Sequence, residues 1–283
     1  MPEPVAVEAG RTSNLRLRVL SAMVLIPVVL LAVAFGGLSF LALTIIMAGA
    51  AFWEWCEITD PKGPVWVRVV TNAGLLVGIC FVGYHHLAWA ALLWLAVFVV
   101  LILLAFRQRR AGWMAVGLLY VAIPSGGLLV LRGAGIGWYP ILFLMLVVWV
   151  TDTAAYFGGR SLGGPKLWRR VSPKKTWSGA LSGLAGALIV AAVLSASVHW
   201  RADALLVAVL LSIASQCGDL LESAVKRKFD VKDSGTLIPG HGGVLDRIDG
   251  LYGAAACAWL LASAGWAGGL FATPLLSAAG AAP

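Results

Sequence analysis

The sequence predicts an all-α, polytopic membrane protein with about nine transmembrane helices. Of its 283 residues, 60% are hydrophobic and only 12% are charged, whereas soluble globular domains are about half apolar and a quarter charged. A helix needs roughly 20 apolar residues to cross a bilayer, so nine helices use about 180 residues and leave about 100 for loops. These proportions exclude a soluble, disordered or collagen-like chain, and they leave no room for a separate soluble domain.

Long apolar runs, separated by short breaks rich in glycine and polar residues, mark the expected helices. They are Val19–Phe35, Leu38–Trp53, Val67–Tyr84, Leu87–Phe106, Met114–Leu131, Tyr139–Phe157, Ala180–Val198, Ala204–Leu221 and Gly250–Phe271. The first run follows basic residues and ends in small residues, as a secretory signal does, but the second run begins only two residues later. We therefore expect the first run to be retained as a helix.

The basic residues predict which side of the membrane each loop faces, because cytoplasmic loops carry an excess of Lys and Arg. With a cytoplasmic amino terminus, nine spans place 19 of the 21 Lys and Arg residues on the cytoplasmic side and only Arg132 and Arg201 outside. Residues 1–18 then form a basic, poorly ordered cytoplasmic tail. Two cytoplasmic loops are long and polar, Gly158–Gly179 and Glu222–Asp249, and we expect any chemistry to occur there.

The segment Gln216–Gly250 concentrates carboxylates, cations and glycines. Asp219 and Glu222 are one helical turn apart, as are Asp246 and Asp249, so each pair can present its oxygens on one helix face. Carboxylates beside Lys and Arg suit Mg²⁺ and phosphates, because carboxylates hold the metal, the metal bridges phosphate oxygens, and cations neutralise the remaining charge. This pattern predicts a site for a phosphorylated substrate.

Three glycines surround His241 just before the last expected helix: Gly240, Gly242 and Gly243. Without side chains there, backbone N–H groups can approach an anion, and the start of a helix also favours negative charge. The same segment holds four cations that can either neutralise phosphates or simply attract anionic lipid. These cations are Lys226, Arg227, Lys228 and Lys232.

The other long loop, from Asp152 to Gly179, is rich in residue types that bind phosphate, namely hydroxyl donors and ammonium charges. Its candidates are Ser172, Lys174, Lys175 and Thr176. It is not a Walker A loop, because GxxxxGK[ST] is absent, and a basic loop lying on the lipid surface is the alternative. Asp152 stands at the end of the sixth apolar run, where an ionisable group is costly and marks function.

Several short motifs follow one another between Ser223 and Asp249: Ser-x-Val-Lys-Arg, Lys-Asp-x-Gly, Ile-Pro-Gly-His-Gly-Gly and Asp-Arg-Ile-Asp. With the earlier DTxAYxxGR and SPKKTW segments, they resemble the phosphatidate cytidylyltransferases, also called CDP-diacylglycerol synthases. The resemblance divides the chain into amino-terminal helices at 19–131 and a catalytic region at 132–283, whose signature is 216–250. Ser178 departs from the family, which commonly has an acidic or amide residue there, and this puts in doubt a role for that side chain.

The resemblance implies that a cytidylyl group passes from CTP to phosphatidic acid, giving CDP-diacylglycerol and pyrophosphate for phospholipid synthesis. It implies that Asp219 and Asp246 hold Mg²⁺, with Asp249 as a further ligand or support, and it leaves a second cation open. Catalytic or substrate contacts are expected from Lys226, Arg227, Ser223, Lys232, Arg247 and the first-loop candidates. Asp152 and Asp233 would support them, and His241 would either donate to a phosphate or make a structural hydrogen bond.

Two other functions stay open. A CTP-dependent lipid kinase would use similar chemistry but release CDP, and a cation-coupled transporter would also place carboxylates in a helical membrane protein. Nucleic-acid binding is not expected, because the basic residues are spread along the membrane face. The resemblance indicates a bacterial inner-membrane protein. Independently, the motifs lie in the loops predicted to be cytoplasmic, so we expect the site to face the cytoplasm and to meet membrane lipid. Homodimerisation is left open.

Overall fold

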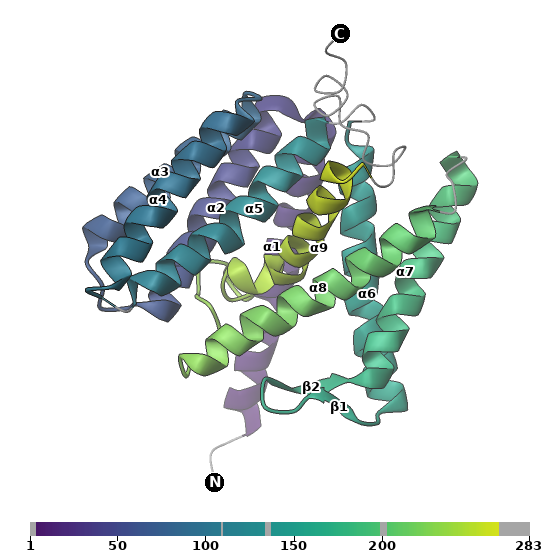
Figure 1. Ribbon diagram of the computed structural model, residues 1–283. Coiled ribbons are helices and arrows are strands. Elements are labelled where there is room, and N and C mark those ends of the chain that lie inside the picture. The colour runs from purple at the N-terminus through teal and green to yellow at the C-terminus, as the bar shows by residue number, and fades with distance from the viewer. Residues whose placement is uncertain (1–3, 109, 134–136, 199–202, 266–283) are drawn as a thin grey trace.

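The computed structural model describes residues 4–108, 110–133, 137–198 and 203–265. Within these ranges the chain forms nine helices and one antiparallel hairpin (Figure 1). The helices are α1 (Pro4–Phe35), α2 (Gly37–Thr59), α3 (Val65–Gly83), α4 (Leu87–Ala105), α5 (Ala111–Gly133), α6 (Tyr139–Leu162), α7 (Trp177–Val198), α8 (Asp203–Lys228) and α9 (Leu245–Ser263). The strands are β1 (Lys166–Trp168) and β2 (Ser172–Thr176). The predicted helical fold is confirmed, and the hairpin is an addition to it.

Seven of the described helices, α2 to α8, are long and apolar enough to cross a membrane. The apolar part of α1, Val19–Phe35, is shorter. Helix α9 is not among the seven, and it carries Asp246, Arg247 and Asp249 near its start. The structure thus supports a polytopic membrane protein, while membrane crossing by α1 and α9 stays a prediction.

Several helix ends differ from the prediction where polar residues continue an apolar helix. Helix α8 extends to Lys228 instead of ending at Leu221, and α9 begins at Leu245 instead of Gly250. Charged residues such as Lys and Arg are good helix formers, but a search for apolar runs stops at them. Helix α1 begins at Pro4, so its backbone continues through most of the segment predicted as a tail. The expected end of the last helix, Phe271, lies outside the described residues.

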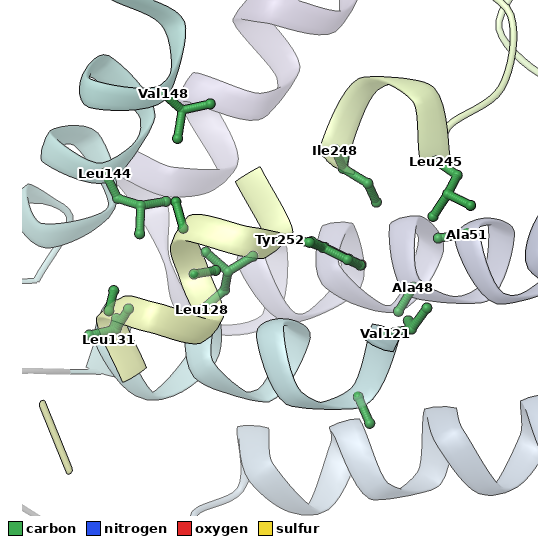
Figure 2. Close-up of a cluster of buried hydrophobic side chains, with 14 of the residues drawn as sticks. Ala48, Ala51, Val121, Leu128, Leu131, Leu144, Val148, Leu245, Ile248 and Tyr252 are labelled. Atoms are coloured by element: carbon green, nitrogen blue, oxygen red, sulfur yellow. The ribbon is translucent and has the colours of Figure 1, made fainter. Parts of the chain in front are cut away.

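Helix α5 is central, because it contacts α2, α3, α4, α6 and α9. Figure 2 shows side chains of α2, α5, α6 and α9 converging in one apolar cluster that contains Ala51, Val121, Leu144 and Tyr252. By contrast, α4 fully buries only Ala90 and Leu101, and Trp94, Val97 and Phe98 pack partly buried against the core. Many of its other apolar side chains are exposed, among them Trp89, Leu92, Leu95 and Leu103, as on a lipid-facing helix.

Two glycines allow α8 and α9 to approach closely. A Cβ atom added at Gly218 would lie 2.5 Å from the carbonyl oxygen of Asp249 and 3.0 Å from the Cα atom of Gly253. Small residues at such crossings let helix backbones come together. The contact brings Asp219 on α8 and Asp249 on α9 to the same cavity, which is the main consequence of the fold for function.

Candidate active site

A cavity of about 940 Å³ lies between the hairpin, α6, α7, α8 and the start of α9. Pockets for small ligands usually measure about 300–1,000 Å³, so this one can take a nucleotide-sized molecule. Its wall combines six cations with five carboxylates. They are Arg160, Lys166, Lys174, Lys175, Lys226, Arg247, Asp152, Asp219, Asp233, Asp246 and Asp249.

The structure gathers most of the predicted site residues around this cavity. Ten of the fifteen candidates line it: Asp152, Lys174, Lys175, Thr176, Asp219, Lys226, Asp233, Asp246, Arg247 and Asp249. They come from two loops that are distant in the sequence, and the fold brings those loops together. The two segments predicted to carry the chemistry therefore supply most of the charged wall of one cavity.

Four of the remaining candidates do not line the cavity, although each is next to a lining residue in the sequence or contacts one. Lys232 and Arg227 are exposed, and Arg227 Nη1 donates to the carbonyl oxygen of Val231 at 3.1 Å. Ser223 Oγ donates to the Asp219 carboxylate at 3.4 Å, so it can orient that carboxylate. Ser172 begins strand β2 and is partly buried.

His241 has structural partners. Its Nδ1 atom lies 2.7 Å from the hydroxyl oxygen of Ser21 on α1. Its carbonyl oxygen accepts hydrogen bonds from Arg247 Nε at 3.0 Å and from Arg247 Nη2 at 2.7 Å. The sequence left open whether His241 donates to a phosphate or makes a structural hydrogen bond, and these contacts are of the structural kind.

Lys226 of α8 contacts two carboxylates, Glu222 on its own helix and Asp246 on α9. Its Nζ atom lies 2.6 Å from Glu222 Oε2 and 2.5 Å from Asp246 Oδ1. Glu222 is only 1% exposed, and a buried carboxylate needs such a partner. The sequence paired Glu222 with Asp219 as neighbouring oxygen donors, but in the structure Glu222 contacts Lys226.

Asp246 is held on both carboxylate oxygens. Lys226 binds Oδ1, while Oδ2 accepts hydrogen bonds from the backbone N–H groups of Ser234 at 3.0 Å and Gly243 at 3.2 Å. Hydrogen bonds from charged or backbone donors to a carboxylate fix its orientation. Asp246 therefore faces the cavity in one defined position.

The anion expected at the glycine-rich turn is supplied by the protein itself. Glu54 Oε1 of α2 accepts from the N–H of Val244 at 2.9 Å, and Oε2 accepts from the N–H of Leu245 at 2.8 Å. Gly243 donates to Asp246. Of the three glycines expected to leave N–H groups open to an anion, Gly243 donates to a carboxylate, whereas the N–H of Gly242 donates to the carbonyl oxygen of Ile238. The N–H groups of residues 243–245 thus meet carboxylates of the protein, so they are not open for a substrate phosphate.

The hairpin contacts α8 through an ion pair. Lys175 Nζ of β2 lies 2.5 Å from Asp219 Oδ2, and both side chains are partly exposed. The pair links the two motif-bearing segments across the cavity. The pair presents one cation of β2 and one carboxylate of α8 to a molecule that binds in the cavity.

Comparison with known proteins agrees with this geometry. Residues 16–264 match the model of the Cytidylyltransferase family. The chain belongs to this family. It is 44% identical over 272 residues to the phosphatidate cytidylyltransferase of Brucella suis biovar 1 (strain 1330), which covers 93% of this chain and 96% of the relative. It is 32% identical over 257 residues to the phosphatidate cytidylyltransferase of Bacillus subtilis (strain 168), with 83% and 93% covered.

Membership of the cytidylyltransferase family makes the chain a nucleotidyltransferase and disfavours the kinase and transporter alternatives. Sequence reasoning missed some residues that line or support the site, among them Arg160, Lys166, Gln216 and Glu54. Arg160 and Lys166 lie in the predicted first loop, so their charge was the available signal. For Glu54 the signal was an acidic residue at the end of an apolar run.

Proposed function

We propose that this protein transfers the cytidylyl group of CTP to phosphatidic acid, which releases pyrophosphate and leaves CDP-diacylglycerol for phospholipid synthesis. One observation carries the proposal: a cavity walled by six cations and five carboxylates lies among helices able to cross a membrane, in a cytidylyltransferase chain. Such a cavity suits a polyphosphate, and the surrounding helices can border the lipid that carries the second substrate.

Cytidylyl transfer mainly requires that the phosphate charges of both substrates are neutralised and that the two phosphates are aligned. A phosphate oxygen of phosphatidic acid forms a bond to the α-phosphorus of CTP, while the bond from that phosphorus to the bridging oxygen of pyrophosphate breaks. The attacking oxygen is already anionic near neutral pH, so repulsion between two polyanions is the obstacle. Cations that hold both phosphates in line remove it. Lys174 and Lys175 of β2 and Arg247 of α9 supply such cations to the cavity.

The carboxylates at the cavity fit Mg²⁺. Among the residues described, no group of three or more His, Cys, Asp or Glu side chains is arranged as a ready-made metal site. Mg²⁺ usually takes one or two carboxylates and completes its shell with water and substrate phosphates. Asp219, Asp246 and Asp249 all line the cavity. Asp219 pairs with the partly exposed Lys175, whereas Asp246 is held by the more buried Lys226 and by two backbone N–H groups.

We therefore assign Mg²⁺ to Asp219 and Asp249, with Asp246 as a further ligand only if it gives up a present partner. When bound, Mg²⁺ would neutralise phosphate charge and polarise the α-phosphate. A second cation stays a prediction. The cations of the wall would bind the phosphates that the metal does not reach, and Ser223 would hold Asp219 in place.

The proposal places the amino terminus and the active site at the cytoplasmic face of a bacterial inner membrane. The distribution of Lys and Arg supports this orientation. Two contacts join groups that were predicted in cytoplasmic loops or at the cytoplasmic end of a span, which supports a common face: Arg110 lies 3.6 Å from Asp60, and Lys175 contacts Asp219. CTP is available on that side, and the basic residues would attract the anionic lipid headgroup. Homodimerisation stays a prediction.

The test is a product analysis on the full chain purified in mild detergent with CTP, phosphatidic acid and Mg²⁺. We expect pyrophosphate and CDP-lipid to appear together, to depend on Mg²⁺, and to be lost in Asp246→Asn. This variant should fold, because Glu222 still neutralises Lys226. CDP with a newly phosphorylated lipid would identify a kinase, and a folded, CTP-binding chain without turnover would contradict the proposal and favour a transporter.

A further inference from the structure

Glu54 of α2 inserts a buried carboxylate into the start of α9. The residue is 2% exposed. Its two oxygens accept three hydrogen bonds: Val244 N–H at 2.9 Å, Leu245 N–H at 2.8 Å, and the hydroxyl of Ser234 at 3.0 Å. These donors compensate the cost of burying the charge. Glu54 thus connects the amino-terminal helices to the segment that carries the site.

Two glycines of that segment leave the space that Glu54 fills. A Cβ atom at Gly235 would lie 2.6 Å from Glu54 Oε1, and a Cβ atom at Gly243 would lie 2.6 Å from Glu54 Oε2. Real Cβ atoms do not approach other atoms so closely. The absence of side chains at these positions is therefore explained by the Glu54 carboxylate.

Ser234 connects Glu54 to Asp246. Its hydroxyl donates to Glu54 and accepts from the N–H of Asp246 at 3.3 Å. Its own N–H donates to Asp246 Oδ2 at 3.0 Å. A displacement of Glu54 would therefore move Ser234, whose N–H binds the carboxylate of Asp246 and whose hydroxyl binds the backbone N–H of Asp246.

We propose that Glu54 is a positioning residue for cytidylyl transfer, which holds residues 234–246 so that Asp246 and Lys226 face the cavity in one arrangement. Glu54 is not among the residues that line the described cavity, so it acts through Ser234 and the start of α9. The inference rests on the proposed function. The competing role is a helix cap that stabilises the start of α9 and does not affect turnover.

The first arm of the test compares Glu54→Gln with the native chain. The amide has the same size but places an NH₂ group against at least one of the three donors. Displacement of a catalytic group by about 1 Å can cost about a hundredfold in rate, so we expect kcat to fall about ten- to hundredfold while the KM for CTP changes little. Ser234→Ala should lower kcat similarly, and the double variant should lose less than the product of the two single effects.

The matched control is Thr59→Val, which removes a buried hydroxyl from α2, the helix that carries Glu54. Thr59 is buried, and its hydroxyl donates to the carbonyl oxygen of Trp55 in the same helix at 2.8 Å. It makes none of the contacts described for Glu54. Turnover close to native in Thr59→Val would show that the kcat loss is specific to the Glu54 contacts.

The second arm measures hydrogen–deuterium exchange of the full chain without substrate or metal. We expect residues 234–246 to exchange faster in Glu54→Gln and Ser234→Ala, with the other helices and Thr59→Val unchanged. Native exchange in that segment, or native kcat in Glu54→Gln, would overturn the proposal. Should Glu54→Gln fail to fold, Ser234→Ala decides by the same two readouts. A native chain without cytidylyl transfer would refute the proposed function, and the exchange arm would still decide whether Glu54 orders the segment.

Discussion

Lys175 and Asp219 contact each other across the cavity, with 2.5 Å between Nζ and Oδ2. Lys175 belongs to strand β2 and Asp219 to helix α8, so the pair links the two segments whose motifs indicate nucleotide chemistry. Both side chains are partly exposed, and ion pairs of this kind stabilise a fold by only about 0–1 kcal/mol. The pair is therefore weak enough to be exchanged for contacts with a metal ion and a phosphate.

Lys175→Met should impair catalysis without destabilising the protein. A hydrogen bond to a charged group is worth about 1.5–3 kcal/mol, so loss of one phosphate contact should lower kcat/KM for CTP about ten- to hundredfold. The matched control is Lys62→Met, in the exposed turn after α2, which should behave as native. Steady-state kinetics and thermal unfolding in detergent measure both effects. A native kcat/KM in Lys175→Met would contradict a phosphate-binding role.

Lys226→Met should destabilise the protein, because it leaves Glu222 buried without its cation. Removing one partner of a buried pair costs about 3–5 kcal/mol, and Glu222 is 1% exposed. Adding Glu222→Gln removes the uncompensated charge, so the double variant should recover much of the stability but no activity. Unfolding in denaturant measures the first effect and cytidylyl transfer the second. Recovery of both would show that Lys226 serves the fold alone.

Hydropathy predicted the helices that are apolar along most of their length, as α2 to α8 are. It misplaced the end of α8 and the start of α9 because both ends are charged, and hydropathy does not distinguish a charged helical turn from a loop. The hairpin was not predicted. Its strands are three and five residues long, too short for an alternating pattern to show.

The site was predictable where residues lie within one motif and less so where contact depends on packing. Asp246 and Asp249 were found from their spacing, since one helical turn separates them. Glu54 lies 180 residues before Ser234 in the chain, and no local sequence pattern predicts that α2 packs against the start of α9. For the same reason the sequence indicated an anion at the glycine-rich turn but not that the protein provides it.

Asp219→Asn should weaken the dependence of turnover on Mg²⁺. Even a residue that supports a metal ligand contributes about ten- to hundredfold to metal affinity, so the Mg²⁺ concentration for half-maximal rate should rise about tenfold or more. The control is Asp230→Asn in the loop after α8, where Asp230 is exposed and has φ 57°, a conformation that Asn tolerates well. Titration of the rate with Mg²⁺ after removal of metal by EDTA measures both. An unchanged midpoint in Asp219→Asn would remove this residue from the metal site.

Gly243→Ala should lower both stability and turnover through a steric clash. The added methyl group would lie 2.6 Å from Glu54 Oε2 and 2.8 Å from the nitrogen of Gly235, and it would overlap the hydroxyl of Ser234. Overpacking of this kind costs about 1–3 kcal/mol.

The matched control for that prediction is Gly112→Ala in α5, where the methyl group would meet only Ala105 Cβ at an ordinary 3.6 Å. Alanine is also the better helix former, so this variant should be as stable as the native chain or slightly more so. Because the clash at Gly243 and the lost acceptor in Glu54→Gln disturb the same contacts, their effects on kcat should combine less than additively in free energy. Full additivity, measured in a double-mutant cycle, would show that Gly243 and Glu54 act on turnover independently.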